Sequence, residues 1–218
     1  YPHMVAPGMV YISQPTEYGT IYSLAELEAL GAVCRKHAIP LYIDGARLGY
    51  ALTAKDNDVT LSDLARLTDV FYIGGTKVGA LFGEAIVISN PEISEDFRYL
   101  IKQRGGMLAK GWLLGLQFVA LLEDGLYWKI ATQANCHADK LRDKLLELGY
   151  SFYVPGSTNQ IFPILPHKLL DALSRDFTFS EECPIDENSR AVRFCTSWAT
   201  TEENVDKLCG ALREYAKL

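Results

Sequence analysis

The sequence lacks several patterns that would assign a function directly. No apolar run reaches about 18 residues, the length that a membrane-spanning helix needs. The motif GxxxxGK(S/T) of phosphate-binding loops, the motif GxGxxG of dinucleotide sites and the motif GxSxG of serine hydrolases are all missing. The five cysteines include no CxxC pair, and the four histidines are scattered without metal-ligand spacing. We therefore expect neither a membrane partner nor a metal site.

The charge and the cysteines limit the partners further. The 218 residues carry a formal net charge of −6, which leaves no broad basic face, so nucleic acid is not an expected partner. An odd number of cysteines without paired spacing suits buried thiols in a reducing compartment, and we expect a cytoplasmic protein. A composition of 49% hydrophobic and 22% charged residues is typical of a globular protein.

The start of the chain is unusual. It begins YPHMVAPGMVYIS, without an initiator methionine, a capped helix or the architecture of a signal peptide. This start is typical of a chain that enters its fold midway, and we expect that the protein has further residues before it.

Strands and helices alternate through the first half. Ser23 and Glu26 form the capping box S-x-x-E, which predicts a helix to about His37, and residues 62–67 predict one or two further helical turns. Continuous apolar runs, typical of strands that are buried on both faces, predict strands at residues 9–13, 40–44, 69–73 and 85–89. This alternation indicates an α/β fold with a mostly parallel sheet.

The second half has a different pattern. Two helical stretches at 109–123 and 127–147 precede Gly149, a residue that often ends helices. Thr200 and Glu203 form a second capping box, which predicts a last helix near the C-terminus. Between them we predict short strands at 151–154, 159–164 and 191–196, with a helix near 167–175.

The change of pattern indicates two domains. We predict that residues 1–126 belong to a large domain and that residues 127–218 form a small C-terminal α/β domain. The sequence contains no internal repeat and no low-complexity segment that would suggest a third unit.

Polar residues follow two neighbouring predicted strands. Asp44 ends the run 40–44, Arg47 follows it at i+3, and Lys77 lies in the turn GGTK after the run 69–73. In open α/β sheets, functional groups collect at the carboxyl ends of strands. A lysine amine can form a Schiff base with the aldehyde of pyridoxal phosphate, while an aspartate pairs with the pyridinium nitrogen and so helps the ring to accept electrons. The sequence therefore indicates a pyridoxal phosphate site.

The surroundings of Lys77 support this interpretation and also allow a simpler one. We expect the nearby glycines to let the backbone approach a cofactor, and we expect a site of low dielectric that favours a neutral amine. The simpler interpretation is that Lys77 is a solvated turn residue, Asp44 a turn former and Arg47 its ion-pair partner. The glycines concerned are Gly74, Gly75, Gly79 and Gly83.

Five segments carry a resemblance to a known family. They are DGARL (44–48), GGTKVGALFGEAIVI (74–88), KQRGGMLAKG (102–111), STNQIF (157–162) and VRFCTSWATTEENVD (192–206). Over essentially the whole chain, they resemble the low-specificity L-threonine aldolases of the β-eliminating lyase group. The resemblance implies the aspartate-aminotransferase-like (type I) fold, in which residues 1–126 are the C-terminal part of the cofactor-binding large domain. It also implies retro-aldol cleavage of L-threonine or L-allo-threonine to glycine and acetaldehyde with pyridoxal 5'-phosphate, by a homodimer or homotetramer.

The same resemblance implies roles for individual residues. Lys77 would be the catalytic lysine that binds the cofactor aldehyde, and Asp44 the partner of the pyridinium nitrogen. Arg47 would lie beside the phenolic oxygen of the cofactor, and Thr76 would supply a hydroxyl next to the lysine. Arg193 would bind the α-carboxylate of the substrate through two parallel hydrogen bonds.

The sequence also departs from the family pattern. Leu108 and Ala109 stand where many members have Arg and Gln. Thr16 and Glu17 lie where members have a polar active-site segment. Family members carry a long further segment before the part that matches Tyr1, and it supplies the phosphate-binding loop and a residue that stacks on the ring. We therefore expect the 218-residue chain alone to be inactive.

Two alternatives to the aldolase stay open. The chain could belong to another type I pyridoxal phosphate enzyme, such as an aminotransferase or a β-eliminating lyase with other substrates. It could also be a non-catalytic, truncated relative that serves in binding or assembly.

Overall fold

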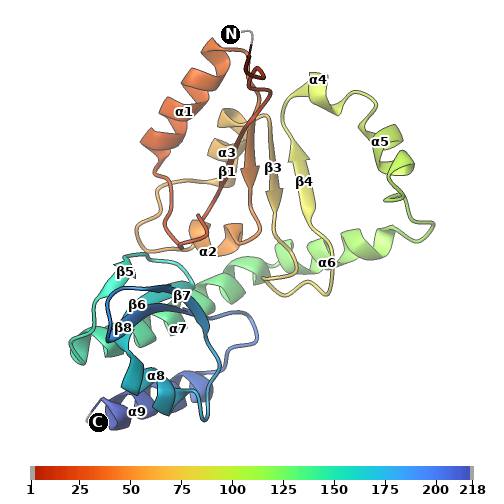
Figure 1. The fold of residues 1–218 in the computed structure, drawn as a ribbon. Helices are drawn as coiled ribbons and strands as arrows, with labels where there is room; N and C mark the ends of the chain where they lie inside the picture. The colour runs from red at the N-terminus through yellow and green to blue at the C-terminus, as the bar shows by residue number, and fades with distance from the viewer. Residues whose placement is uncertain (1–2, 217–218) are drawn as a thin grey trace.

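The computed structural model describes residues 3–216, which form two four-stranded sheets connected by long helices (Figure 1). The first sheet contains β1 (Val10–Ser13), β2 (Leu41–Asp44), β3 (Val70–Ile73) and β4 (Ala85–Ile88), in that order. Strands β1, β2 and β3 run parallel, and β4 pairs antiparallel with β3. The prediction of an α/β fold with a mostly parallel sheet is confirmed, and all four predicted strands are present.

One face of the first sheet packs into a hydrophobic core. Ile43 of β2 and Phe71 of β3 are buried there against Leu27 of α1 (Leu24–Lys36) and Leu64 of α3 (Leu61–Leu67). Helix α1 begins at the predicted capping box, in which Ser23 and Glu26 each accept from the backbone of the other. Because neighbouring side chains alternate between the faces of a strand, the opposite face carries another set of residues. We call it the Asp44 face, and it presents Tyr11, Tyr42, Asp44 and Tyr72.

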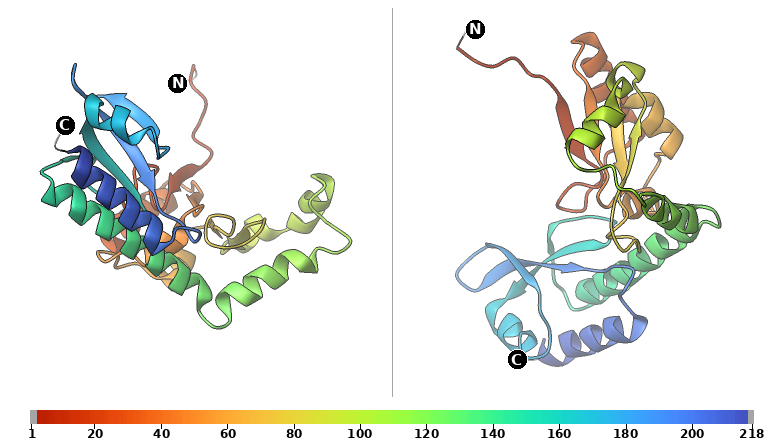
Figure 2. Two further views of the ribbon diagram at one scale, coloured as in Figure 1. Left: turned by 90° about the horizontal axis from the view of Figure 1, so that it is seen from below. Right: turned by 90° about the vertical axis from the view of Figure 1, so that its right-hand side faces the viewer.

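Three helices follow β4, and they are α4 (Pro91–Ser94), α5 (Phe97–Gln103) and α6 (Trp112–Leu122). Helix α5 together with the beginning of α6 projects from the side of the molecule (Figure 2), whereas Leu121 of α6 is buried in the first core. Helix α6 is apolar on most sides, and Trp112, Leu116 and Val119 are more than half exposed.

The second sheet is antiparallel throughout, in the order β5-β6-β8-β7. Its strands are β5 (Phe152–Val154), β6 (Gln160–Pro166), β7 (Ser180–Pro184) and β8 (Ser189–Cys195). Helices α8 (His167–Leu173) and α9 (Glu202–Tyr215) contribute Leu169 and Val205 to its core. Strand β7 was not predicted, because its residues SEECP are mostly exposed and lack an apolar pattern.

The cap of the last helix differs from the prediction by one residue. The side chain of Thr201, not that of Thr200, accepts a hydrogen bond from the backbone N–H of Asn204 at 3.3 Å. The hydroxyl of Thr200 instead accepts from the backbone N–H of Ser197 at 2.9 Å. Thr200 and Thr201 are consecutive, and either hydroxyl could cap the helix. The conformation of the loop before the helix determines that Thr201 is the N-cap.

Helix α7 (Leu126–Glu147) contributes to both cores. Tyr127 and Ala131, in its first half, are buried with the first sheet, whereas Leu141 and Leu145, in its second half, are buried with the second sheet. The predicted domain division between residues 126 and 127 stays a prediction, and α7 belongs structurally to both units. No helix among residues 3–216 combines the length and the apolar character that crossing a membrane requires.

Candidate active site

Asp44, the last residue of β2, has a carboxylate that accepts three hydrogen bonds. It accepts hydrogen bonds from the phenol groups of Tyr11 on β1 and Tyr72 on β3, and from the backbone N–H of Ala46 at 2.9 Å. Burial raises the pKa of Asp44, but these hydrogen bonds and the nearby charge of Lys77 outweigh burial, so that its pKa lies below its ordinary value. The carboxylate is therefore held in its charged form at neutral pH.

The turn that carries Lys77 is fixed from one side by Glu84. The carboxylate of Glu84 accepts a hydrogen bond from the backbone N–H of Gly75 and another, at 3.0 Å, from the hydroxyl of Thr76. The predicted cofactor residue Thr76 thus directs its hydroxyl toward Glu84 in this structure. Sequence reasoning did not single out Glu84.

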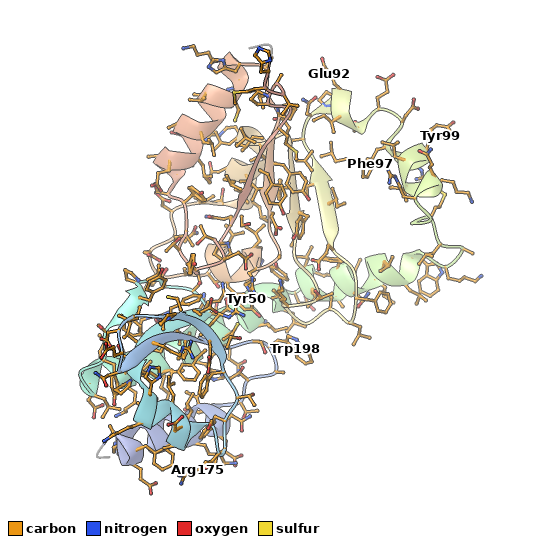
Figure 3. All side chains as sticks on the ribbon, in the orientation of Figure 1. Tyr50, Glu92, Phe97, Tyr99, Arg175 and Trp198 are labelled. Atoms are coloured by element: carbon orange, nitrogen blue, oxygen red, sulfur yellow. The ribbon has the colours of Figure 1, made fainter. Side chains whose placement is uncertain are left out.

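Two buried tyrosines donate hydrogen bonds to backbone carbonyls of the same turn. The hydroxyl of Tyr50, on α2 (Leu48–Leu52), donates to the carbonyl of Lys77. The hydroxyl of Tyr127 donates to the carbonyl of Gly74 at 2.9 Å. Figure 3 places Tyr50 where the two sheets meet, close to Trp198 on the segment between β8 and α9. The backbone of the lysine turn is thereby fixed, while its side chain stays outside the core.

Lys77 is exposed, which differs from the expected site of low dielectric. Its side chain forms no ion pair with any residue in the described range 3–216, although its charge acts on Asp44. An exposed primary amine beside a charged carboxylate remains available to a small molecule.

The glycines at the two strand ends make room for protein backbone. A Cβ atom on Gly45 would lie 1.8 Å from the carbonyl oxygen of Tyr72, and one on Gly74 would lie 2.3 Å from the carbonyl oxygen of Ala46. The expectation that glycine at position 74 makes room for a cofactor is therefore corrected: its neighbour is the segment after Asp44. These two glycines allow the strand ends of β2 and β3 to approach each other, and this approach brings Asp44 close to Lys77.

Arg47 and Arg193 extend the site toward the second sheet. The guanidinium of Arg47, only 15% exposed, lies 3.4 Å from the carboxylate of Glu17. Arg193 on β8 lies 3.5 Å from the carboxylate of Glu182 and donates to the hydroxyl of Ser180 at 3.3 Å. Both arginines line one groove of about 1150 Å³ that continues along α9.

The thiol of Cys195 lies near three of the predicted site residues. Desolvation raises the pKa of its thiol, while the charges of Arg47, Arg193 and Lys77 act in the opposite direction. All three cations therefore lie within electrostatic reach of one sulfur atom. The structure thus places Arg47 and Arg193 along one groove and Lys77 near Asp44, although these residues come from both halves of the chain.

This set of groups suits pyridoxal 5'-phosphate by its chemistry. A carboxylate that stays charged matches a protonated ring nitrogen, and an exposed amine on the adjacent strand end matches an aldehyde. Guanidinium groups match oxygens that carry negative charge. The residues present on the chain therefore fit the ring part of this cofactor.

The fold is that of the aspartate-aminotransferase-like enzymes. A double mutant of aspartate aminotransferase from Thermus thermophilus aligns with 98% of this chain and 58% of its own at 18% identity, with a TM-score of 0.69. At that identity the likeness shows the fold alone. The model of the beta-eliminating lyase family matches residues 2–166, and the chain belongs to this family.

Two relatives are more similar in sequence. The low specificity L-threonine aldolase of a Pseudomonas species is 33% identical over 216 residues, which are 97% of this chain and 60% of the relative. The structure of the threonine aldolase of Leishmania major is 44% identical with a TM-score of 0.96, over 99% of this chain and 63% of that chain. The chain thus spans about three fifths of the length of these relatives. Membership of the family implies dependence on pyridoxal phosphate.

Proposed function

We propose that the protein is an aldehyde-lyase that uses pyridoxal 5'-phosphate to cleave L-threonine or L-allo-threonine to glycine and acetaldehyde. The observation that carries this proposal is the proximity of the charged Asp44 carboxylate to the Lys77 amine at adjacent strand ends. Enzymes with this fold catalyse several reactions of amino acids. The similarity to threonine aldolases from Pseudomonas and Leishmania favours cleavage of threonine among them.

Each residue of the site would have a separate role in the reaction. The bound cofactor supplies an electron-accepting ring that stabilises the negative charge left on Cα when the bond between Cα and Cβ breaks. The amine of Lys77 would hold the cofactor through its aldehyde until a substrate amino group takes its place. The carboxylate of Asp44 would keep the ring nitrogen protonated, and the guanidinium of Arg47 would hold the phenolic oxygen. Thr76, whose hydroxyl donates to Glu84 here, would contribute next to Lys77.

Arg193 would orient the substrate. Its guanidinium lies in the groove shared with Arg47 and can offer two parallel donors to the α-carboxylate. Because Glu182 and Ser180 already hold this side chain in place, little rotational freedom is lost when the substrate binds.

The test combines covalent trapping with product analysis. The full-length protein is loaded with cofactor, reduced with borohydride and digested, and we expect the cofactor mass on the peptide that contains Lys77. Without reduction, we expect acetaldehyde and glycine from threonine, and no keto acid from alanine. A cofactor attached to Lys77 together with amino transfer from alanine would support an aminotransferase instead. Absence of the cofactor from Lys77 would contradict the proposal itself.

We also propose a homodimer or homotetramer and a cytoplasmic location. The exposed apolar side chains of α6, among them Trp112 and Leu116, support self-association, because such groups are normally covered. The five free cysteines support a reducing compartment. Light scattering of the wild type and of Leu116→Glu tests the first point: we expect a larger mass for the wild type and a monomer for the variant.

A further inference from the structure

The Asp44 carboxylate is held between two phenol groups, one from each neighbouring strand. In the sheet register, Tyr11 of β1 lies opposite Tyr42 of β2, and Tyr42 lies opposite Val70 of β3. Tyr72 follows Val70 by two residues and therefore shares its face. The two hydroxyls reach different oxygens of the carboxylate: Tyr11 donates to Oδ2 and Tyr72 to Oδ1.

We propose that Tyr11 and Tyr72 are positioning residues that fix the Asp44 carboxylate for its contact with the ring nitrogen of the cofactor. The inference rests on the proposed function, because it assigns these tyrosines a role toward the same cofactor. Neither tyrosine has to touch the reacting atoms, since each acts through Asp44.

The number of acceptor positions supports this role. A carboxylate offers about four lone-pair positions on its two oxygens. Three hydrogen bonds, from Tyr11, Tyr72 and the backbone N–H of Ala46, are already made. The remaining capacity suits one further donor, such as a protonated ring nitrogen. Donors on both oxygens also prevent rotation of the carboxylate about its Cβ–Cγ bond.

The phenols remain donors at physiological pH. The hydrogen bond to Asp44, followed by burial, raises the pKa of Tyr11 to about 12. Burial, followed by the hydrogen bond to Asp44, raises the pKa of Tyr72 even more strongly. Because two neutral donors make the carboxylate a weaker base, a proton shared with the ring nitrogen should stay on nitrogen.

The other charged and titratable groups nearby are few. The charge of Lys77 acts on Asp44, that of Glu17 on Tyr11 and that of Glu84 on Tyr72. Tyr42 lies on the same face, and its ring stacks on that of Tyr11 with centroids 5.2 Å apart. Within the described residues, its hydroxyl donates no hydrogen bond to Asp44. Tyr42→Phe is therefore a matched control that removes a hydroxyl from the same face.

The experiment, carried out in the full-length protein, compares Tyr11→Phe, Tyr72→Phe and the double variant with Tyr42→Phe. Phenylalanine keeps the ring and its packing, so only the hydroxyl is lost, and circular dichroism checks the fold. The first measurement is the pKa of Asp44 in cofactor-free protein, from the ¹³C shift of its labelled carboxyl group. The second is the dissociation constant of pyridoxal 5'-phosphate, from an absorbance titration. The third is kcat and KM for threonine.

We expect a higher pKa of Asp44 in both single variants and the largest rise in the double variant. The double variant should bind the cofactor about tenfold more weakly and lose at least about tenfold in kcat, because hydrogen bonds to charged groups are strong. Its KM should change little, since neither tyrosine contacts the substrate. Tyr42→Phe should match the wild type in all three measurements.

Two results would overturn the inference, and they are distinguishable. If the wild type binds the cofactor and the Phe variants match it in pKa and dissociation constant, the tyrosines serve packing only, and this inference alone fails. If the wild type takes up no cofactor under any condition, the proposed function fails, and the inference fails with it.

Discussion

The ammonium group of Lys77 lies near enough to the carboxylate of Asp44 to contribute to its low pKa, although 32 residues separate them in the sequence. Close backbone packing at Gly45 and Gly74 makes this possible, because a side chain at either position would collide with the neighbouring strand end. Lys77 and Asp44 lie near each other without forming a direct ion pair. They do so because the parallel strands β2 and β3 end at the same edge of the sheet.

Replacement of Lys77 by Ala should abolish acetaldehyde release while the fold stays intact. The exposed side chain contributes little to packing, so only its amine chemistry is lost. An aldehyde assay and circular dichroism measure the two effects. Lys102→Ala, at the end of α5, removes another lysine and should retain full activity. Near-normal turnover in folded Lys77→Ala would refute the assignment.

Replacement of Asp44 by Asn should leave the cofactor bound but slow the cleavage of the bond between Cα and Cβ. An amide cannot hold the ring nitrogen protonated as a carboxylate does. Single-turnover kinetics with threonine measure the step. A variant that keeps more than about a tenth of wild-type activity, equivalent to roughly 1.4 kcal/mol or less of barrier, would contradict the electron-sink role.

The low pKa of Asp44 also predicts how stability depends on pH. A carboxyl whose pKa is lower in the folded than in the unfolded chain stabilises the fold above the unfolded pKa of about 3.9, and this contribution is lost as the pH falls through the folded pKa. We expect the stability difference between the wild type and Asp44→Asn to be constant at neutral pH and to shift against the wild type in acid. Urea denaturation at a series of pH values measures it. A shift in favour of the wild type on acidification would show that the sign is wrong.

Replacement of Arg193 by Gln should raise KM for threonine by at least about tenfold, because a charge-assisted contact to the α-carboxylate is lost. Steady-state kinetics measure the change. Arg190→Gln is the matched control, since Arg190 lies on the same strand and pairs with Glu181 on β7 in the same manner. Equal effects of the two substitutions would indicate a role in the pairing of β7 with β8, not in substrate binding.

Replacement of Tyr127 by Phe should lower the free energy of unfolding by about 1–3 kcal/mol. The buried hydroxyl donates to the carbonyl of Gly74 and accepts from the backbone N–H of Gly49, and both groups would lose their partner. Urea denaturation measures the loss. Tyr150→Phe, a partly buried tyrosine next to the second core, should cost less. An unchanged stability of Tyr127→Phe would mean that the turn of Lys77 does not depend on this contact.

Local patterns were sufficient for most of the fold. The capping box of Ser23 and Glu26 and the apolar runs of the first sheet act over a few residues, so the sequence alone could reveal them. Strand β7 could not be found in this way, because its pairing with β8 and not its own composition makes it a strand. Helix α2 (Leu48–Leu52) was also missed, since five residues carry too little periodicity.

The candidate site was predictable only in part. Asp44 and Lys77 could be selected because each follows a strand, and the structure brings them together. The contacts of Tyr11 and Tyr72 with Asp44 depend on the register of three strands, which no local pattern specifies. Glu84 was missed because its partners are a backbone N–H and a hydroxyl nine and eight residues earlier, in a turn of irregular geometry.

Helix α7 has a consequence for how the molecule unfolds. Because one continuous helix supplies Tyr127 to the first core and Leu145 to the second, melting of either core removes support from the other. Separate expression of residues 127–218 would also remove Tyr127 and Ala131 from the core of the first sheet and leave them exposed to water. We therefore expect the two sheets to unfold together, so that every probe observes a single unfolding transition.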